Sequence, residues 1–189
     1  MALLVAGILL FTVVHLLPAV APDMRAGLAA KLGDKTYQAL FSAVILAALV
    51  VIVFGWKATT PTGVYNPPFR GGPLVSAAIF FAFVLFVASK ARSNYRRFVR
   101  HPQMMSVILW SAAHLLVNGD SRSVVLFGGL GAWAVAEIVF CNKRDGAWQK
   151  PDVAPFSADM TVAVIAAVAF AIFFYLHKAL FGVLPYWPG

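Results

Sequence analysis

Two histidines, a tryptophan and an asparagine lie close together in the stretch R-H-P-Q-M-M-S-V-I-L-W-S-A-A-H-L-L-V-N-G-D, residues 100–120. Trp110, His114 and Asn118 recur every four residues, so in a helix they share one face. His101 lies thirteen positions before His114, roughly 220° around a helix at about 100° per residue. Imidazoles bind metals and transfer protons, but these two cannot do so together from one helix face. A partner for His114 must therefore come from another helix.

Two further histidines are candidates for that partner. His15 stands near the end of the apolar stretch F-T-V-V-H-L-L-P. An ionisable group inside a membrane is costly unless it faces the protein interior, so His15 is a candidate functional residue. A packing histidine bonded to a neighbouring carbonyl is the open alternative. His177, beside Lys178 near the end of the chain, is expected to be solvated, although by depth it would pair with His114 more easily than His15 would.

Composition decides the class of protein that carries these residues. Of the 189 residues, 61% are hydrophobic and 12% charged, and the mean hydropathy is +0.84, whereas soluble domains carry about 25% charged residues. Six apolar segments are close in length to the roughly 17–25 residues that a membrane-spanning helix needs. They cover residues 2–20, 37–56, 74–91, 102–117, 124–141 and 161–180. We therefore predict an all-α integral membrane protein, a six-transmembrane-helix bundle in a single domain over residues 1–189.

The net charge of +8 is arranged as a topology signal rather than as a nucleic-acid site. Eleven of the fifteen basic residues fall in three alternate loops, namely Arg25, Lys31, Lys35, Lys90, Arg92, Arg96, Arg97, Arg100, Lys143, Arg144 and Lys150. The other four are Lys57, Arg70, Arg122 and Lys178. Because basic loops stay in the cytoplasm, both termini are predicted to face away from the cytoplasm, which in a bacterial inner membrane is the periplasmic side. The basic loops would also attract anionic membrane lipids, and no nucleic-acid partner is expected.

Glu137 is the only carboxylate inside a predicted span. It should lie near the depth at which Arg100 and His101 enter the preceding apolar segment, residues 102–117, and an ion pair or hydrogen bond with them would keep its charge there. The chain has one cysteine, Cys141, which excludes an internal disulfide and a cysteine-based cluster.

Histidine is the main residue type in this sequence that could bind a cofactor or take part in a reaction. Inward imidazoles from separate membrane helices, with aromatic residues nearby, are what axial ligation of a haem requires. Ser111 and Asn118 would supply hydrogen bonds around such a ligand. Arginines at a membrane face, such as Arg100, would hold the haem propionates.

The motifs H-L-L-P, R-H-P-Q and W-S-A-A-H-L-L-V-N-G-D, followed by S-V-V-L-F-G, resemble the NnrU family. Members of that family are associated with bacterial denitrification, and the family is similar to 15-cis-zeta-carotene isomerase. The resemblance implies a haem b held by His15 and His114. From their expected depth and charge, we place Arg100, His101 and Glu137 in the same predicted cofactor site. Where the isomerase has a cysteine shortly before the second histidine, this chain has Ser111 and no thiol.

Three functions remain open at this point. The first is a haem b membrane protein of nitrite or nitric oxide metabolism, acting as a redox component or an isomerase-like enzyme. It would have a membrane redox partner and a small hydrophobic or nitrogen-oxide ligand. The second is a membrane methyltransferase, because R-H-P also resembles isoprenylcysteine carboxyl methyltransferases. The third is an assembly factor without a cofactor.

Overall fold

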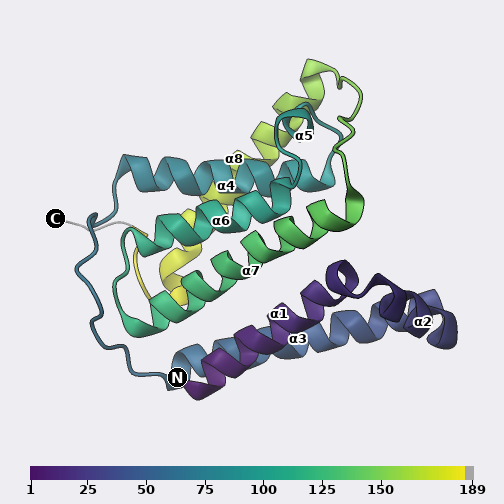
Figure 1. The fold of residues 1–189 in the computed structure, drawn as a ribbon. Coiled ribbons are helices and arrows are strands. Elements are labelled where there is room, and N and C mark those ends of the chain that lie inside the picture. Colours follow the sequence, from purple (N-terminus) through teal and green to yellow (C-terminus); the bar gives the residue numbers. More distant parts are fainter. Residues whose placement is uncertain (186–189) are drawn as a thin grey trace. The chain divides into compact units, whose positions relative to one another are not determined.

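The computed structural model describes residues 1–185, and this part of the chain forms eight helices and no strand (Figure 1). The predicted periplasmic C-terminal end, residues 186–189, lies outside the described residues. The helices are α1 (Ala2–Val20), α2 (Pro22–Leu32), α3 (Asp34–Ala58), α4 (Pro73–Lys90), α5 (Tyr95–Phe98), α6 (Pro102–Leu115), α7 (Ser121–Asp145) and α8 (Phe156–Phe181). The predicted all-α fold is confirmed.

Five helices, α1, α3, α4, α7 and α8, are long and apolar enough to cross a membrane. The sixth predicted span is only partly realised, since α6 has 14 residues where the hydropathy pattern predicted 102–117. At 1.5 Å per residue α6 is about 21 Å long, less than the roughly 30 Å of a bilayer core. Five long helices are thus found, and six crossings are not confirmed by helix length.

Prolines start three of the helices. Pro22, Pro73 and Pro102 each occupy the first turn, where the missing N–H loses no helical bond. The predicted start of α6 at Pro102 is confirmed. The helix ends at Leu115, because the following residues turn and place Asn118 and Gly119 outside it.

The chain divides into two compact units, and the predicted single domain stays a prediction. The first unit consists of Met1–Val64 and Asp120–Ala147, with α1, α2, α3 and α7. In this unit α1 packs along α3 and against α7, and α2 contacts both α1 and α3. Leu4, Ile8 and Ile52 form its buried core.

Glycines bring the helices of the first unit into backbone contact. A Cβ atom on Gly55 would come within 3.0 Å of the Leu4 backbone, and one on Gly7 would lie 2.8 Å from Ile52 Cγ1. On α7, a Cβ on Gly129 would lie 2.9 Å from Ile8 Cγ2. Small residues therefore decide how closely α1 approaches its neighbours.

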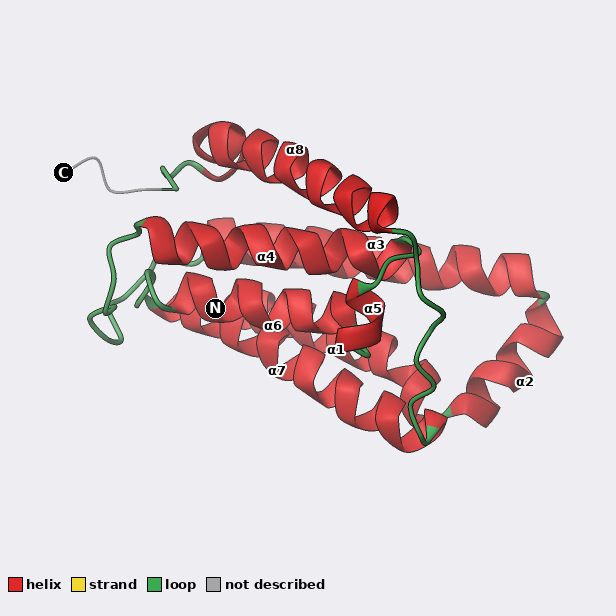
Figure 2. Cartoon of the chain, turned by 90° about the horizontal axis from the view of Figure 1, so that it is seen from above, coloured by secondary structure: helices red, strands yellow, loops and turns green. Residues whose placement is uncertain are grey.

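The second unit consists of Tyr65–Gly119 and the chain from Trp148 onward, with α4, α5, α6 and α8. Figure 2 shows α4 between α6 and α8, and α4 contacts both. Val84 and Ala88 of α4 pack with Val162 and Ala166 of α8 in a buried cluster. The unit thus has α4 as its central helix, and α4 supports α6, which carries His114.

Candidate functional site

His15 lies in the last two turns of α1 with its ring orientation held by a backbone hydrogen bond. Its Nδ1 is 3.1 Å from the carbonyl oxygen of Phe11, one turn earlier. A carbonyl oxygen only accepts hydrogen bonds, so Nδ1 carries the proton and Nε2 carries the lone pair. The Phe11 ring also packs on the imidazole, with centroids 4.0 Å apart.

Aromatic rings from three helices surround His15. The ring of Trp133 on α7 lies 5.0 Å from the imidazole, and the ring of Phe41 on α3 lies 5.7 Å away. Trp133 is 6% exposed, and its Nε1 has no hydrogen-bond partner among the described residues. Trp133 was not predicted as a site residue, because the histidine that it contacts lies on another helix.

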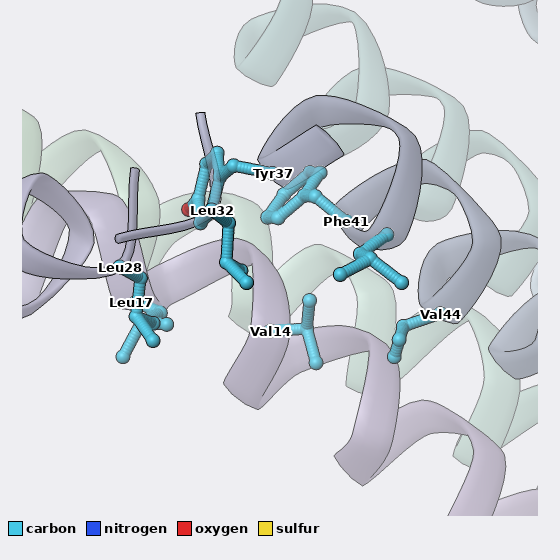
Figure 3. Close-up of a pocket in the computed structure, with 8 residues that line it drawn as sticks. Val14, Leu17, Leu28, Leu32, Tyr37, Phe41 and Val44 are labelled. Carbon is cyan, nitrogen blue, oxygen red and sulfur yellow. The ribbon is translucent and has the colours of Figure 1, made fainter. Parts of the chain in front are cut away.

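Phe41, which packs beside His15, also lines an apolar groove. The groove has a volume of about 220 Å³ and is bounded by α1, α2 and α3 (Figure 3). Its lining residues are Val14, Leu17, Leu28, Leu32, Tyr37, Leu40, Phe41 and Val44. Its surface offers apolar contacts and almost no polar ones, so it suits a hydrocarbon chain rather than a polar substrate.

His114, in the second unit, has the same local arrangement as His15. Its Nδ1 is 2.8 Å from the carbonyl oxygen of Trp110, again one turn earlier, and the Trp110 ring lies 4.9 Å from the imidazole. The predicted shared face of Trp110 and His114 is confirmed. Here too Nδ1 must be the donor, which leaves the lone pair on Nε2.

Ser111 and Asn118 take different positions around His114. Ser111 is 3% exposed, and its Oγ has no hydrogen-bond partner among residues 1–185. Asn118 lies in the turn after α6, and its Nδ2 donates to the backbone carbonyl of His114 at 2.8 Å. Asn118 therefore holds the main chain of His114 through a bond to its carbonyl.

His177, which was expected to be solvated, makes an exposed hydrogen bond to the protein backbone. Its Nδ1 lies 2.8 Å from the carbonyl oxygen of Val183, and its ring packs against Phe181 at 4.9 Å. His177 belongs to the same unit as His114. It thus remains a possible partner for His114. His15 belongs to the other unit, and its pairing with His114 stays a prediction.

Glu137 lies on the face of α7 that packs against α1. Trp133 on this face contacts His15, and Arg144 donates from Nη1 to the Pro18 carbonyl at 3.1 Å. Between Trp133 and Arg144 along α7, the thiol of Cys141 donates to Glu137 Oε1 at 3.6 Å. Arg144 thereby caps the end of α1 with a positive charge, a role that the sequence did not reveal.

The predicted contact of Glu137 with Arg100 or His101 joins residues of different units and stays a prediction. His101 is the N-cap residue of α6, where its carbonyl accepts from the Met105 N–H at 3.0 Å. Across the described residues, no group of three or more His, Cys, Asp and Glu side chains converges to hold a metal ion.

The fold defines a multi-pass membrane protein, because five of its helices have the length and apolarity to cross a bilayer. Comparison with protein families identifies it further: the sequence profile described as NnrU protein matches residues 3–185, nearly the whole chain. The chain belongs to the NnrU family. No curated protein matches the chain, and no solved structure matches it.

Proposed function

We propose that this chain is a haem b-binding protein of the bacterial inner membrane, with His15 and His114 as the axial ligands. The observation that carries the proposal is the matching orientation of the two imidazoles. Each donates from Nδ1 to the carbonyl of an aromatic residue one turn earlier, Phe11 or Trp110, at 3.1 and 2.8 Å. Metal-binding histidines commonly make such a bond, because it fixes the ring and directs the Nε2 lone pair toward the metal.

The residues around the histidines fit a flat, apolar cofactor. Phe41 and Trp133 supply ring faces and edges beside His15, and Trp110 does so beside His114. The Trp133 Nε1–H and the Ser111 hydroxyl are buried polar groups with no protein partner in the described chain. Such groups are costly unless something accepts from them, and they suit the polar edge of a ligand.

The remaining members of the proposed site would hold its charged groups. Arg100 and His101 would neutralise carboxylates of the cofactor at the membrane face, and Glu137 would balance their charge. A haem bound here would supply one-electron chemistry or a site for a small ligand on iron. The chain's own part is to hold both imidazoles neutral and oriented inside an apolar site.

Membership of the NnrU family supports a role in nitrite or nitric oxide metabolism. We propose that the protein acts there as a redox component or an isomerase-like enzyme with a membrane redox partner. A nitrogen oxide or a small hydrophobic molecule would be its ligand. The apolar groove beside Phe41 suits the hydrophobic alternative.

We also propose that the chain crosses the membrane six times, with both termini periplasmic. The Phe69 N–H donates to the Leu116 carbonyl at 3.1 Å, so the chain before α4 meets the chain after α6. Because α4 has the length to cross the bilayer, α6 must bring the chain back, despite its 14 residues. This supports a crossing by α6 together with its flanking turns.

The test of haem binding uses the full chain, expressed with haem supply and purified in mild detergent. The wild type should show the Soret band of a six-coordinate haem b. His15→Ala and His114→Ala should each lose the haem or shift the band to that of a five-coordinate iron. His177→Ala is the matched control, since it removes an imidazole with the same type of carbonyl bond, and its spectrum should stay unchanged.

The alternative ligand pair is His114 with His177, which belong to the same unit and have the same type of Nδ1 bond to a backbone carbonyl. A spectrum lost in His177→Ala and retained in His15→Ala would assign the ligands to His114 and His177. A colourless wild type after haem-supplemented expression would refute haem binding and favour the methyltransferase or the assembly factor without a cofactor, which a test of S-adenosylmethionine binding would separate.

A further inference from the structure

The C-terminal end of α6 is covered by the segment of residues 65–69, Y-N-P-P-F, which we call the strap. The last carbonyls of a helix have no partner within the helix, and inside a membrane they find no water. The strap supplies their donors. The single O–H of Tyr65 is shared between the carbonyls of Leu115 and Asn118, and the Phe69 N–H donates to that of Leu116 at 3.1 Å.

The strap also touches the turn after α6 through its backbone. The Tyr65 N–H donates to the Gly119 carbonyl at 3.1 Å. A Cβ atom on Gly119 would come within 3.0 Å of the Tyr65 carbonyl oxygen, closer than real Cβ atoms approach. Glycine is therefore required at position 119 for the strap to dock, and two prolines in the strap limit its conformations.

His114 is connected to the strap through Asn118. The His114 carbonyl accepts from the Val117 N–H at 3.1 Å, from the Asn118 N–H at 2.9 Å and from Asn118 Nδ2 at 2.8 Å. The Asn118 carbonyl in turn accepts from the Tyr65 hydroxyl at 2.9 Å. The turn that fixes the main chain of His114 is thus itself held by the Tyr65 hydroxyl, in addition to the backbone hydrogen bonds of the strap.

We propose that Tyr65 is a positioning residue for His114. Its hydroxyl holds the last turn of α6 closed, and this keeps the His114 imidazole in the orientation that its bond to Trp110 requires. The inference rests on the proposed function where it concerns haem. Its effect on the conformation of His114 does not depend on haem.

The test replaces the phenol by a ring of the same shape, in Tyr65→Phe. Tyr175→Phe is the matched control, because Tyr175 is a tyrosine of the same unit that is 82% exposed on α8. Two readouts need no haem: hydrogen exchange of the Val117 and Asn118 amides, and the NMR signals of the His114 imidazole. The third readout is the Soret band and midpoint potential of the haem-loaded protein.

In Tyr65→Phe we expect about tenfold faster exchange of the two amides, shifted His114 signals and a changed midpoint potential, since a lost hydrogen bond changes a local opening equilibrium by about that factor. Tyr175→Phe should match the wild type in all three. Unchanged amide exchange and unchanged His114 signals in Tyr65→Phe would overturn the inference.

Two further outcomes keep the inference and the proposed function apart. If the wild type retains no haem after haem-supplemented expression, haem binding is refuted. If Tyr65→Phe still shifts the His114 signals in that haem-free protein, the role of Tyr65 is supported. If Tyr65→Phe does not accumulate, Asn118→Ala removes the Nδ2 bond to the His114 carbonyl from the other side. It should shift the same His114 signals, and their constancy would overturn the inference.

Discussion

Asn94 and Asp159 are joined by two hydrogen bonds, one from the Asn94 N–H and one from its Nδ2, both 2.7 Å long. Asn94 also exchanges bonds with the backbone of Ala154, at 2.8 and 2.9 Å. The chain before α6 and the chain before α8 are therefore neighbours, as the proposed topology requires of two segments on one side of the membrane. In that topology α7, which is long enough to cross, and α6 would both cross between these two segments.

Reporter fusions test this topology directly. A reporter that is active only in the cytoplasm should be active when fused after Arg92 or Lys150 and inactive when fused after Arg122, because α6 lies between Arg92 and Arg122 and α7 lies between Arg122 and Lys150. The basic residues of the loops predict the same sides. Equal activity after Arg92 and Arg122 would mean that α6 does not cross.

Replacing Gly55 by alanine should destabilise the first unit. The added Cβ would meet the Leu4 backbone within 3.0 Å, and backbone atoms cannot move aside as a flexible side chain does. We expect a loss of about 1–3 kcal/mol, measured by thermal unfolding in detergent.

Gly128→Ala is the control for that measurement. A Cβ on Gly128 meets no atom within 4 Å, so alanine should leave stability unchanged or raise it by about 0.5–1 kcal/mol through its helix preference. Equal losses in Gly55→Ala and Gly128→Ala would argue against close packing of α1 on α3.

Asp159→Ala should destabilise the second unit. The carboxylate accepts two bonds from Asn94 and lies in the first turn of α8, where a negative charge is favourable. Hydrogen bonds to charged groups contribute about 1.5–3 kcal/mol, and we expect a loss in that range in chemical unfolding. Asp152→Ala, in the exposed loop before α8, should lower the stability far less. A similar loss in Asp152→Ala would contradict a stabilising role of the Asn94–Asp159 hydrogen bonds.

The tautomers of His15, His114 and His177 can be measured by nitrogen chemical shifts of the full chain. All three should carry the proton on Nδ1 at neutral pH, because each Nδ1 faces a backbone carbonyl that only accepts. Trp110→Phe should leave the tautomer of His114 unchanged, since the accepting group is the main-chain carbonyl. A proton on Nε2 of His15 or His114 would remove the main support for metal ligation.

The amino-acid pattern was sufficient to predict the helical, membrane-embedded class. Long apolar runs can satisfy their backbone in lipid only as helices, so five of the six predicted segments became long helices. The start of α6 at Pro102 was also predictable, because proline restricts its own φ and lacks an N–H. Both are properties of the local sequence, and contacts with other helices do not alter them.

The extent of α6 and the order of residues 59–72 were not predictable in this way. Four prolines and three glycines between residues 59 and 73 are compatible with a loose connector, yet Tyr65 and Phe69 satisfy the carbonyls at the end of α6. Hydropathy extended α6 to 117, whereas the helix ends at Leu115 because donors from the strap replace the bonds of a further turn.

The histidines show the same division between what the sequence predicts and what only the tertiary structure determines. The sequence alone identified His15 and His114 as the imidazoles of interest, from their apolar surroundings and from the spacing of Trp110 and His114. Only the tertiary structure decided that Phe41 and Trp133 of other helices enclose His15, and that Tyr65 supports the turn beyond His114. Periodicity reports which side chains share a face of one helix, but contacts between helices depend on glycine positions and carbonyl partners that lie far apart in the chain.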